Sequence, residues 1–120
     1  MPATRHAQTT PTTDLASLLA DPGLAQTRGH IGGWRDGAGT FAVTDPATGE
    51  AIASVARLDA AAAREAVDAA QAAFPGWAAA LPQERGNILR RWFDLITAAR
   101  EDLALIMVAE QGKPLSEARG

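Results

Sequence analysis

The hydrophobic pattern changes its period once, near Leu58, and this change limits the chain to a small strand unit followed by helices. Between His30 and Ala56, apolar side chains recur at near-alternate positions among glycines, which is the spacing of β-strands. After Leu58 they recur every three or four residues, as on one face of an amphipathic helix. The sequence therefore predicts an α/β fold in which an antiparallel unit comes first and two or three helices follow.

Turn residues divide the strand unit, which we expect over about 30–56. Asp36-Gly37-Ala38-Gly39 and Asp45-Pro46-Ala47-Thr48-Gly49 are both typical turn sequences. They separate three expected strands, at about 30–35, 40–44 and 51–56. The arrangement predicted is an antiparallel hairpin or a three-strand meander.

A short ordered element is expected before the strands. Asp14 is a suitable N-cap for a short helix, and Asp21-Pro22-Gly23 is expected to end it because proline disfavours helix at the preceding residue. Residues 1–13 are rich in Thr, Pro and Ala, and we expect them to form a flexible tail.

Two longer helices are predicted after the strands, at about 59–74 and 82–111. Asp59 caps the first, and Pro75-Gly76 is expected to end it. Pro82 opens the second, with Glu84 in its first turn near the positive end of the helix dipole. The polar stretch 100–102 can interrupt this second helix, and Gly112 and Pro114 are expected to stop it.

The last part of that helix is apolar on two sides. Leu105 and Val108 lie opposite Ile106, so this segment needs burial on both faces. Half of the apolar residues are alanine, which leaves few large side chains to supply such burial. Residues 114–120 also begin a further helix that is too short to be stable alone. We therefore expect 14–120 to be the N-terminal portion of a larger domain, truncated at 120.

Composition excludes several classes of function. The chain has no cysteine, so it offers no thiol nucleophile, disulfide or thiolate metal site. Its formal net charge is −3 and its arginines are dispersed, which argues against a nucleic-acid partner. No apolar run approaches the roughly 20 residues that cross a membrane, and no signal-peptide core is evident. A cytoplasmic location is expected.

Four stretches, in their order and spacing, resemble the N-terminal quarter of the aldehyde dehydrogenase superfamily, and the resemblance covers about 23–120. Further matches around 84–96 and 102–104 are closest to bacterial succinate-semialdehyde dehydrogenases. The four stretches are Ile31-Gly32-Gly33-Trp34, Val43-Thr44-Asp45-Pro46-Ala47-Thr48-Gly49-Glu50, Ala72-Ala73-Phe74-Pro75-Gly76-Trp77 and Glu110-Gln111-Gly112-Lys113-Pro114-Leu115.

The resemblance implies oxidation of an aldehyde, succinate semialdehyde by its subgroup, to the carboxylic acid with NAD or NADP. In that family a cysteine thiolate forms a thiohemiacetal, hydride passes to the nicotinamide, and a glutamate-activated water hydrolyses the thioester. The resemblance also implies a homo-oligomer, in which the helices of this segment flank a dinucleotide-binding sheet. No position of this chain matches the family's catalytic or cofactor-binding residues, so none is assigned, and the chain alone is expected to be inactive and to bind no cofactor.

Glu110 is the one candidate ligand. On a continuous helix from Pro82 it lies within about 40° of Ile88 and Ile106, on the apolar face, where a carboxylate needs a partner. The resemblance implies a monovalent-cation site formed by Glu110 with the backbone carbonyls of Val43 and Thr44. The more ordinary alternative is that Glu110 bonds backbone N–H groups or an arginine near the helix end.

Other conspicuous residues have structural explanations. Lys113, the only lysine, lies where a cation suits a helix end, and the glycines of 29–33 suit a hairpin turn better than a phosphate cradle. The three tryptophans are expected to pack, His6 and His30 to face solvent, and Arg90-Arg91 to form a solvated patch.

Two functional hypotheses follow. The first is that this chain is the N-terminal part of an aldehyde dehydrogenase. The second is a non-catalytic helical module that binds a protein partner through the doubly apolar face at 103–108.

Overall fold

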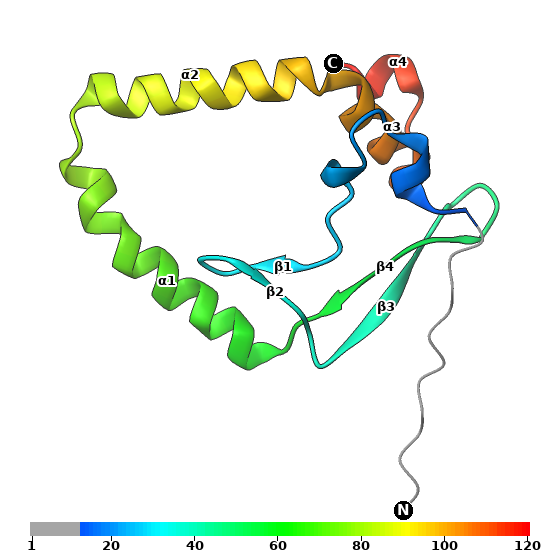
Figure 1. The fold of residues 1–120 in the computed structure, drawn as a ribbon, viewed down its shortest axis with the longest axis horizontal. Helices are drawn as coiled ribbons and strands as arrows, with labels where there is room; N and C mark the ends of the chain where they lie inside the picture. Colours follow the sequence, from blue (N-terminus) through cyan, green and yellow to red (C-terminus); the bar gives the residue numbers. More distant parts are fainter. Residues whose placement is uncertain (1–12) are drawn as a thin grey trace, which may run out of the picture.

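The computed structural model describes residues 13–120, in which the strand pairs lie between the long helices and the C-terminal end of the chain (Figure 1). The two long helices form two sides of an open frame. The short N-terminal turns, the third helix and the longer strand pair lie together at the opposite corner. This is the α/β fold class expected, with antiparallel strand pairs and helices.

The N-terminal element consists of two 3-10 turns, η1 (Leu15–Leu18) and η2 (Pro22–Leu24). Asp14 caps the first as predicted, because its side chain accepts a hydrogen bond from the N–H of Ala16. Asp21 begins the second turn in the same way, through the N–H of Gly23. The expected stop signal 21–23 therefore ends one turn and starts another. The expected tail at 1–13 lies, apart from Thr13, outside the described residues.

The strands form two separate antiparallel pairs, so the three-strand meander is wrong and the hairpin alternative is confirmed. Strands β3 (Gly39–Thr44) and β4 (Ala51–Arg57) pair through the 45–49 turn. The expected first strand is itself a small hairpin, β1 (Gly29–His30) with β2 (Trp34–Arg35). The physical reason is Gly32, whose φ of 63° reverses the chain within that stretch.

The helices differ from the expected bounds at two points. Helix α1 (Ala60–Ala79) begins after the predicted cap Asp59 but continues through Pro75, so the expected end at Phe74 is wrong. Pro75 lacks an N–H and leaves the carbonyl four residues earlier without its helical partner. On an exposed helix that carbonyl can be hydrated, which permits the helix to continue.

The predicted helix at 82–111 is divided into α2 (Pro82–Ala98) and α3 (Arg100–Gln111). The division falls at Ala99, beside the polar stretch expected to interrupt it. Glu101 and Asp102 lie in the first turn of α3, where carboxylates favour the start of a new helix. A short helix, α4 (Leu115–Ala118), follows.

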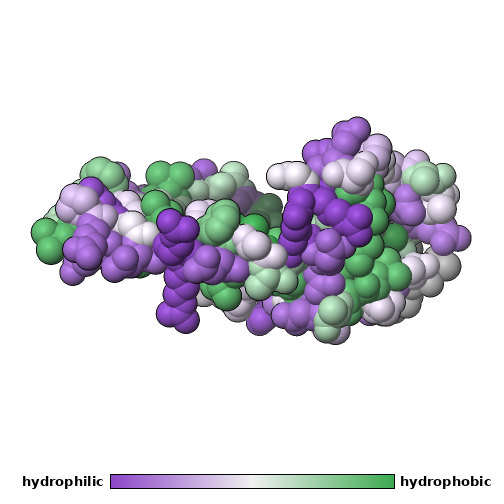
Figure 2. Space-filling view, turned by 90° about the horizontal axis from the view of Figure 1, so that it is seen from above, coloured by the Kyte–Doolittle hydropathy of each residue, from purple (hydrophilic) through white to green (hydrophobic). Residues whose placement is uncertain are grey.

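Most of the buried apolar residues lie on the N-terminal turns, α3 and β4. These are Leu15, Leu19, Ile52 and Ala104, and a further buried residue, Ile31, lies in the β1–β2 turn. In contrast, α1 and α2 contain no buried residue. Large apolar side chains along them, such as Val67, Phe74 and Trp92, are 60–68% exposed. Figure 2 shows hydrophobic surface open among hydrophilic side chains along this part of the molecule.

No helix within residues 13–120 has both the length and the apolar character needed to cross a membrane.

Candidate functional site

A small cavity of about 60 Å³ lies where α3, β4 and the N-terminal segment meet. Glu110 and Ile106 line it from α3, and Ala53 and Val55 from β4. The remaining wall comes from the N-terminal segment through Leu15, Leu24, Ala25, Gln26 and Thr27.

Glu110 is exposed at the rim of this cavity rather than buried on an apolar face. The expectation of burial depended on a continuous helix from Pro82, and the break at Ala99 removes the helical register between Ile88 and Glu110. Within residues 13–120, neither a hydrogen bond nor an ion pair joins the Glu110 carboxylate to a protein group. The alternative in which Glu110 bonds an N–H group or an arginine is therefore not found in this part of the chain.

The other predicted ligands lie close to the same corner but outside the cavity. Val43 and Thr44 end β3, where the pairing register shifts between them, and neither lines the cavity beside Glu110. The end of α3 does reach the following turn, since a Cβ built on Gly112 would lie 3.1 Å from Cγ of Pro46. Among the described residues, no three His, Asp or Glu side chains cluster as metal ligands. The monovalent-cation site remains a prediction.

Asp102 is a further polar residue at this corner, and its role is not among those predicted from the sequence. It is only 8% exposed, and its two carboxylate oxygens accept hydrogen bonds from the N–H groups of Ala20 at 2.9 Å and Asp21 at 2.8 Å. A signal was present in the sequence, because Asp102 lies four residues before Ile106 and thus on the same apolar face. An acid on such a face indicates a buried hydrogen-bonding role.

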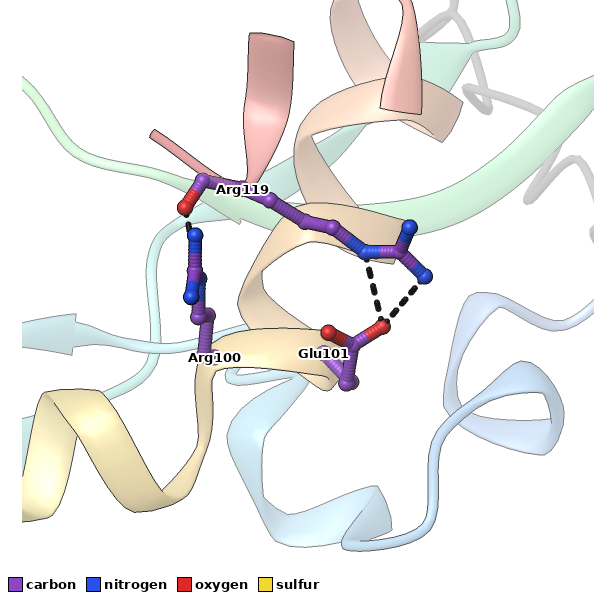
Figure 3. A network of polar contacts seen from close by, with 3 residues as sticks. All are labelled: Arg100, Glu101 and Arg119. Carbon is purple, nitrogen blue, oxygen red and sulfur yellow. Dashed lines mark hydrogen bonds and ion pairs between the residues drawn. The ribbon is translucent and has the colours of Figure 1, made fainter. Parts of the chain in front are cut away.

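A polar network joins the first turn of α3 to α4. Arg119 donates to Oε2 of Glu101 from Nε at 3.0 Å and from Nη2 at 2.7 Å, and Nε of Arg100 donates to the Arg119 carbonyl at 2.6 Å (Figure 3). All three side chains are exposed, so the network fixes the position of α4 without forming an enclosed site.

Gly112 and Lys113 end α3 as the sequence indicates. Gly112 adopts the left-handed conformation, with φ 71° and ψ 16°, and its N–H bonds the Val108 carbonyl. Lys113 follows this cap and is partly exposed.

The remaining candidates do not converge on a site. Trp34 packs edge-on against His30 with ring centroids 5.2 Å apart, and Arg28 lies over its ring at 5.9 Å. Trp77 and Trp92 are 42% and 61% exposed, so the packing expected of them is not found within residues 13–120. His30 and Arg90-Arg91 are exposed as predicted, and His6 lies outside the described residues.

The glycine-rich segment 29–33 forms a hairpin, as the sequence indicates. Gly29 lies in β1, Gly32 and Gly33 lie in the turn, and the chain continues into β2. A phosphate cradle instead requires a glycine-rich turn that leads directly into a helix N-terminus.

Comparison with known proteins decides the family. Residues 34–120 match the model of the family described as "Aldehyde dehydrogenase family". The chain belongs to the aldehyde dehydrogenase family. This confirms the resemblance drawn from the four sequence stretches, three of which lie wholly inside the matched range.

Several relatives of this chain are named as semialdehyde dehydrogenases. The chain is 47% identical over 105 residues to a glutarate-semialdehyde dehydrogenase of Pseudomonas aeruginosa, covering 85% of this chain and 22% of that protein. It is 49% identical over 78 residues to the NADP(+) succinate-semialdehyde dehydrogenase of Escherichia coli, covering 65% of this chain and 16% of that protein.

A solved structure agrees with the fold. The structure described as an Escherichia coli NADP-dependent enzyme superposes with a TM-score of 0.81 at 43% identity, covering 85% of this chain and 22% of that one. The chain thus spans about a fifth of the length of the curated aldehyde dehydrogenases that it matches.

Proposed function

We infer that this chain is the N-terminal part of an NAD(P)-dependent aldehyde dehydrogenase that oxidises a semialdehyde to the corresponding carboxylate. The observation that carries the proposal is the uninterrupted family match over 34–120. The conserved geometry of a related solved structure over 85% of this chain supports it.

The substrate proposed is a semialdehyde of a short dicarboxylic acid, with succinate semialdehyde as the specific choice. The glutarate-semialdehyde relative names a substrate one carbon longer, so these two compounds are the ones to compare. A hydrophobic pocket distinguishes one methylene by only about 10- to 200-fold, and a quantitative comparison is needed. NAD and NADP are both proposed as oxidants.

This chain would serve the reaction as scaffold. It has no cysteine, so it cannot itself form the thiohemiacetal through which the proposed oxidation proceeds. Its proposed contribution is the β3–β4 hairpin and the α1 and α2 faces, which would pack against the remainder of a cytoplasmic, homo-oligomeric enzyme. Large apolar side chains on α1 and α2 are exposed in this chain, and the remainder of such an enzyme would cover them.

The same exposed faces support a second candidate function, a non-catalytic module that binds a protein partner. The exposed large apolar side chains lie on α1 and α2 rather than on the 103–108 face named from the sequence, whose residues are mostly half-buried. In the first function the remainder of the same enzyme covers α1 and α2, and in the second a separate protein partner covers them.

The experiment is an assay of NAD(P)H formation with succinate and glutarate semialdehydes. The 120-residue chain alone is expected to give no turnover. The product of the complete reading frame is expected to oxidise both semialdehydes and to lose activity after thiol alkylation. Turnover by the purified chain alone, or a complete product that is inactive or insensitive to alkylation, would contradict the proposal.

A further inference from the structure

Strand β3 has one edge paired with β4 and one outer edge. In the paired register, Thr40 lies opposite Ala56 and Phe41 lies opposite Val55. The Ala56 N–H donates to the Thr27 carbonyl at 2.8 Å, so the main-chain polar groups of Ala56 point away from β3. In an antiparallel pair, opposite residues either exchange both hydrogen bonds or direct their N–H and C=O groups away from each other. Thr40 and Ala56 therefore form a pair of the second kind.

The alternation of a strand then assigns the groups on the outer edge. Thr40 and Ala42 direct their N–H and C=O groups outward, whereas Phe41 and Val43 direct theirs toward β4. Within residues 13–120, no main-chain hydrogen bond reaches the outward groups of Thr40 and Ala42, and the sheet has only two strands. These groups are thus available to a further strand.

This edge lacks the features that usually protect an exposed strand. Natural edge strands carry charged side chains or proline, or are covered by another element. Strand β3 contains neither a proline nor a charged residue, and all its residues except the half-buried Val43 are exposed. A two-stranded hairpin is also only marginally stable in water. Both observations favour a partner strand at this edge.

The proposed function indicates where such a strand would come from. The chain spans about a fifth of the length of the curated aldehyde dehydrogenases that it matches, so most of the proposed enzyme lies outside this segment. We propose that a β-strand from the remaining part of the same polypeptide pairs with Thr40 and Ala42 and extends the β3–β4 hairpin to three strands. Main-chain hydrogen bonds hold an added strand of this kind. The inference rests on the proposed function, which supplies the remaining polypeptide.

The test is amide hydrogen exchange, which distinguishes the two kinds of residue within one strand. In the 120-residue chain, the N–H groups of Thr40 and Ala42 are expected to exchange faster than those of Phe41 and Val43, which face β4. In the product of the complete reading frame, exchange at Thr40 and Ala42 is expected to slow by about tenfold or more, because each N–H gains a main-chain acceptor. Phe41 and Val43 are the internal control, since they report whether the hairpin itself is formed.

Substitution of Ala42 separates the outer edge from the paired edge. Ala42→Pro removes an outward N–H, which an edge strand tolerates, so exchange at Phe41 and Val43 in the 120-residue chain is expected to stay unchanged. In the complete protein, this variant is expected to return the Thr40 N–H to the faster rate of the chain alone. Ala42→Val is the matched control, because it keeps the N–H and is expected to keep the slow rate. If the complete Ala42→Pro protein does not fold, the comparison of the two native proteins decides.

Either of two results would overturn the proposal. In the first, Thr40 and Ala42 exchange as fast in an active complete protein as in the chain alone, which would leave the proposed function standing. In the second, they are as slow as Phe41 and Val43 in the 120-residue chain, or become so as its concentration rises. That result would place another part of this chain, or a second copy, at the edge. An inactive complete protein that protects both amides would support the pairing and contradict the proposed function.

Discussion

Gly112 ends α3 in a conformation that other residues rarely adopt, because its φ is 71°. A Cβ at this position would also lie 3.1 Å from Cγ of Pro46, which is closer than most such contacts. Gly112→Ala is therefore expected to destabilise the chain by about 1 kcal/mol or more. The measurement is the urea midpoint followed by far-UV circular dichroism.

The matched control is Gly86→Ala, inside α2. Gly86 does not have a positive φ, and a Cβ built on it meets no neighbour within 4 Å. The substitution is therefore expected to stabilise the chain by about 0.5–1 kcal/mol. The two glycines are thus predicted to respond with opposite signs. If the urea midpoint moves in the same direction in both variants, the left-handed conformation of Gly112 does not determine the effect of its substitution.

At the scale of residues, the sequence predicts local hydrogen bonding well and long-range placement poorly. The caps at Asp14 and Asp59 and the glycine at Gly112 are recognisable because their partners lie within four residues. Asp102 is not recognisable in the same way, since its partners are about eighty residues earlier. Glu110 was misplaced because its expected burial depended on an unbroken helix.

At the scale of elements, Pro75 is the residue that most lowers the stability of α1. It lies inside a helix of 20 residues that has no buried side chain, so packing does not offset the hydrogen bond that proline removes. Pro75→Ala restores a backbone N–H inside α1 and is expected to stabilise the helix by up to about 3 kcal/mol. The ellipticity of the folded chain is expected to stay the same, because α1 already extends to Ala79.

The measurement for Pro75→Ala is far-UV circular dichroism with urea unfolding, and Ala69→Gly, in the same helix, serves as the control. Ala69→Gly is expected to lower the stability of the chain by about 1 kcal/mol. A rise in the ellipticity of the folded chain in Pro75→Ala would indicate that α1 ends before residue 75 in solution, and an unchanged urea midpoint would contradict the expected stabilisation.

The same elements show how far periodicity predicts the fold. The alternation at 39–57 and the turn at 45–49 predict β3 and β4, because Asp45 bonds the N–H of Ala47 within its own turn. The pattern at 30–35 predicts one strand, but the chain reverses within this stretch and forms the separate β1–β2 hairpin. Pro75 predicts a helix end because it leaves the Gln71 carbonyl without a helical partner. The sequence alone does not show that Gln71 is exposed, so that water can bond this carbonyl.

At the scale of the whole molecule, the apolar side chains are divided unequally. Within residues 13–120, four of the five buried apolar residues lie on the N-terminal turns, α3 and β4, whereas the large apolar side chains of α1 and α2 are exposed. On α2, Ile88, Trp92 and Leu95 lie on one face and are 57–61% exposed. A contiguous apolar face of this kind is typical of a surface that another part of a protein covers.

We propose that these helix faces pack inside a complete aldehyde dehydrogenase. The most direct test is NAD(P)H formation by a chimera in which this chain replaces the matching N-terminal segment of the Pseudomonas aeruginosa relative. The chimera is expected to be active. Leu95→Glu is expected to abolish its activity while leaving the helicity of the free chain unchanged, and Arg90→Glu, on the opposite face of α2, is expected to be tolerated. An inactive chimera, or an active one that tolerates Leu95→Glu, would contradict the claim.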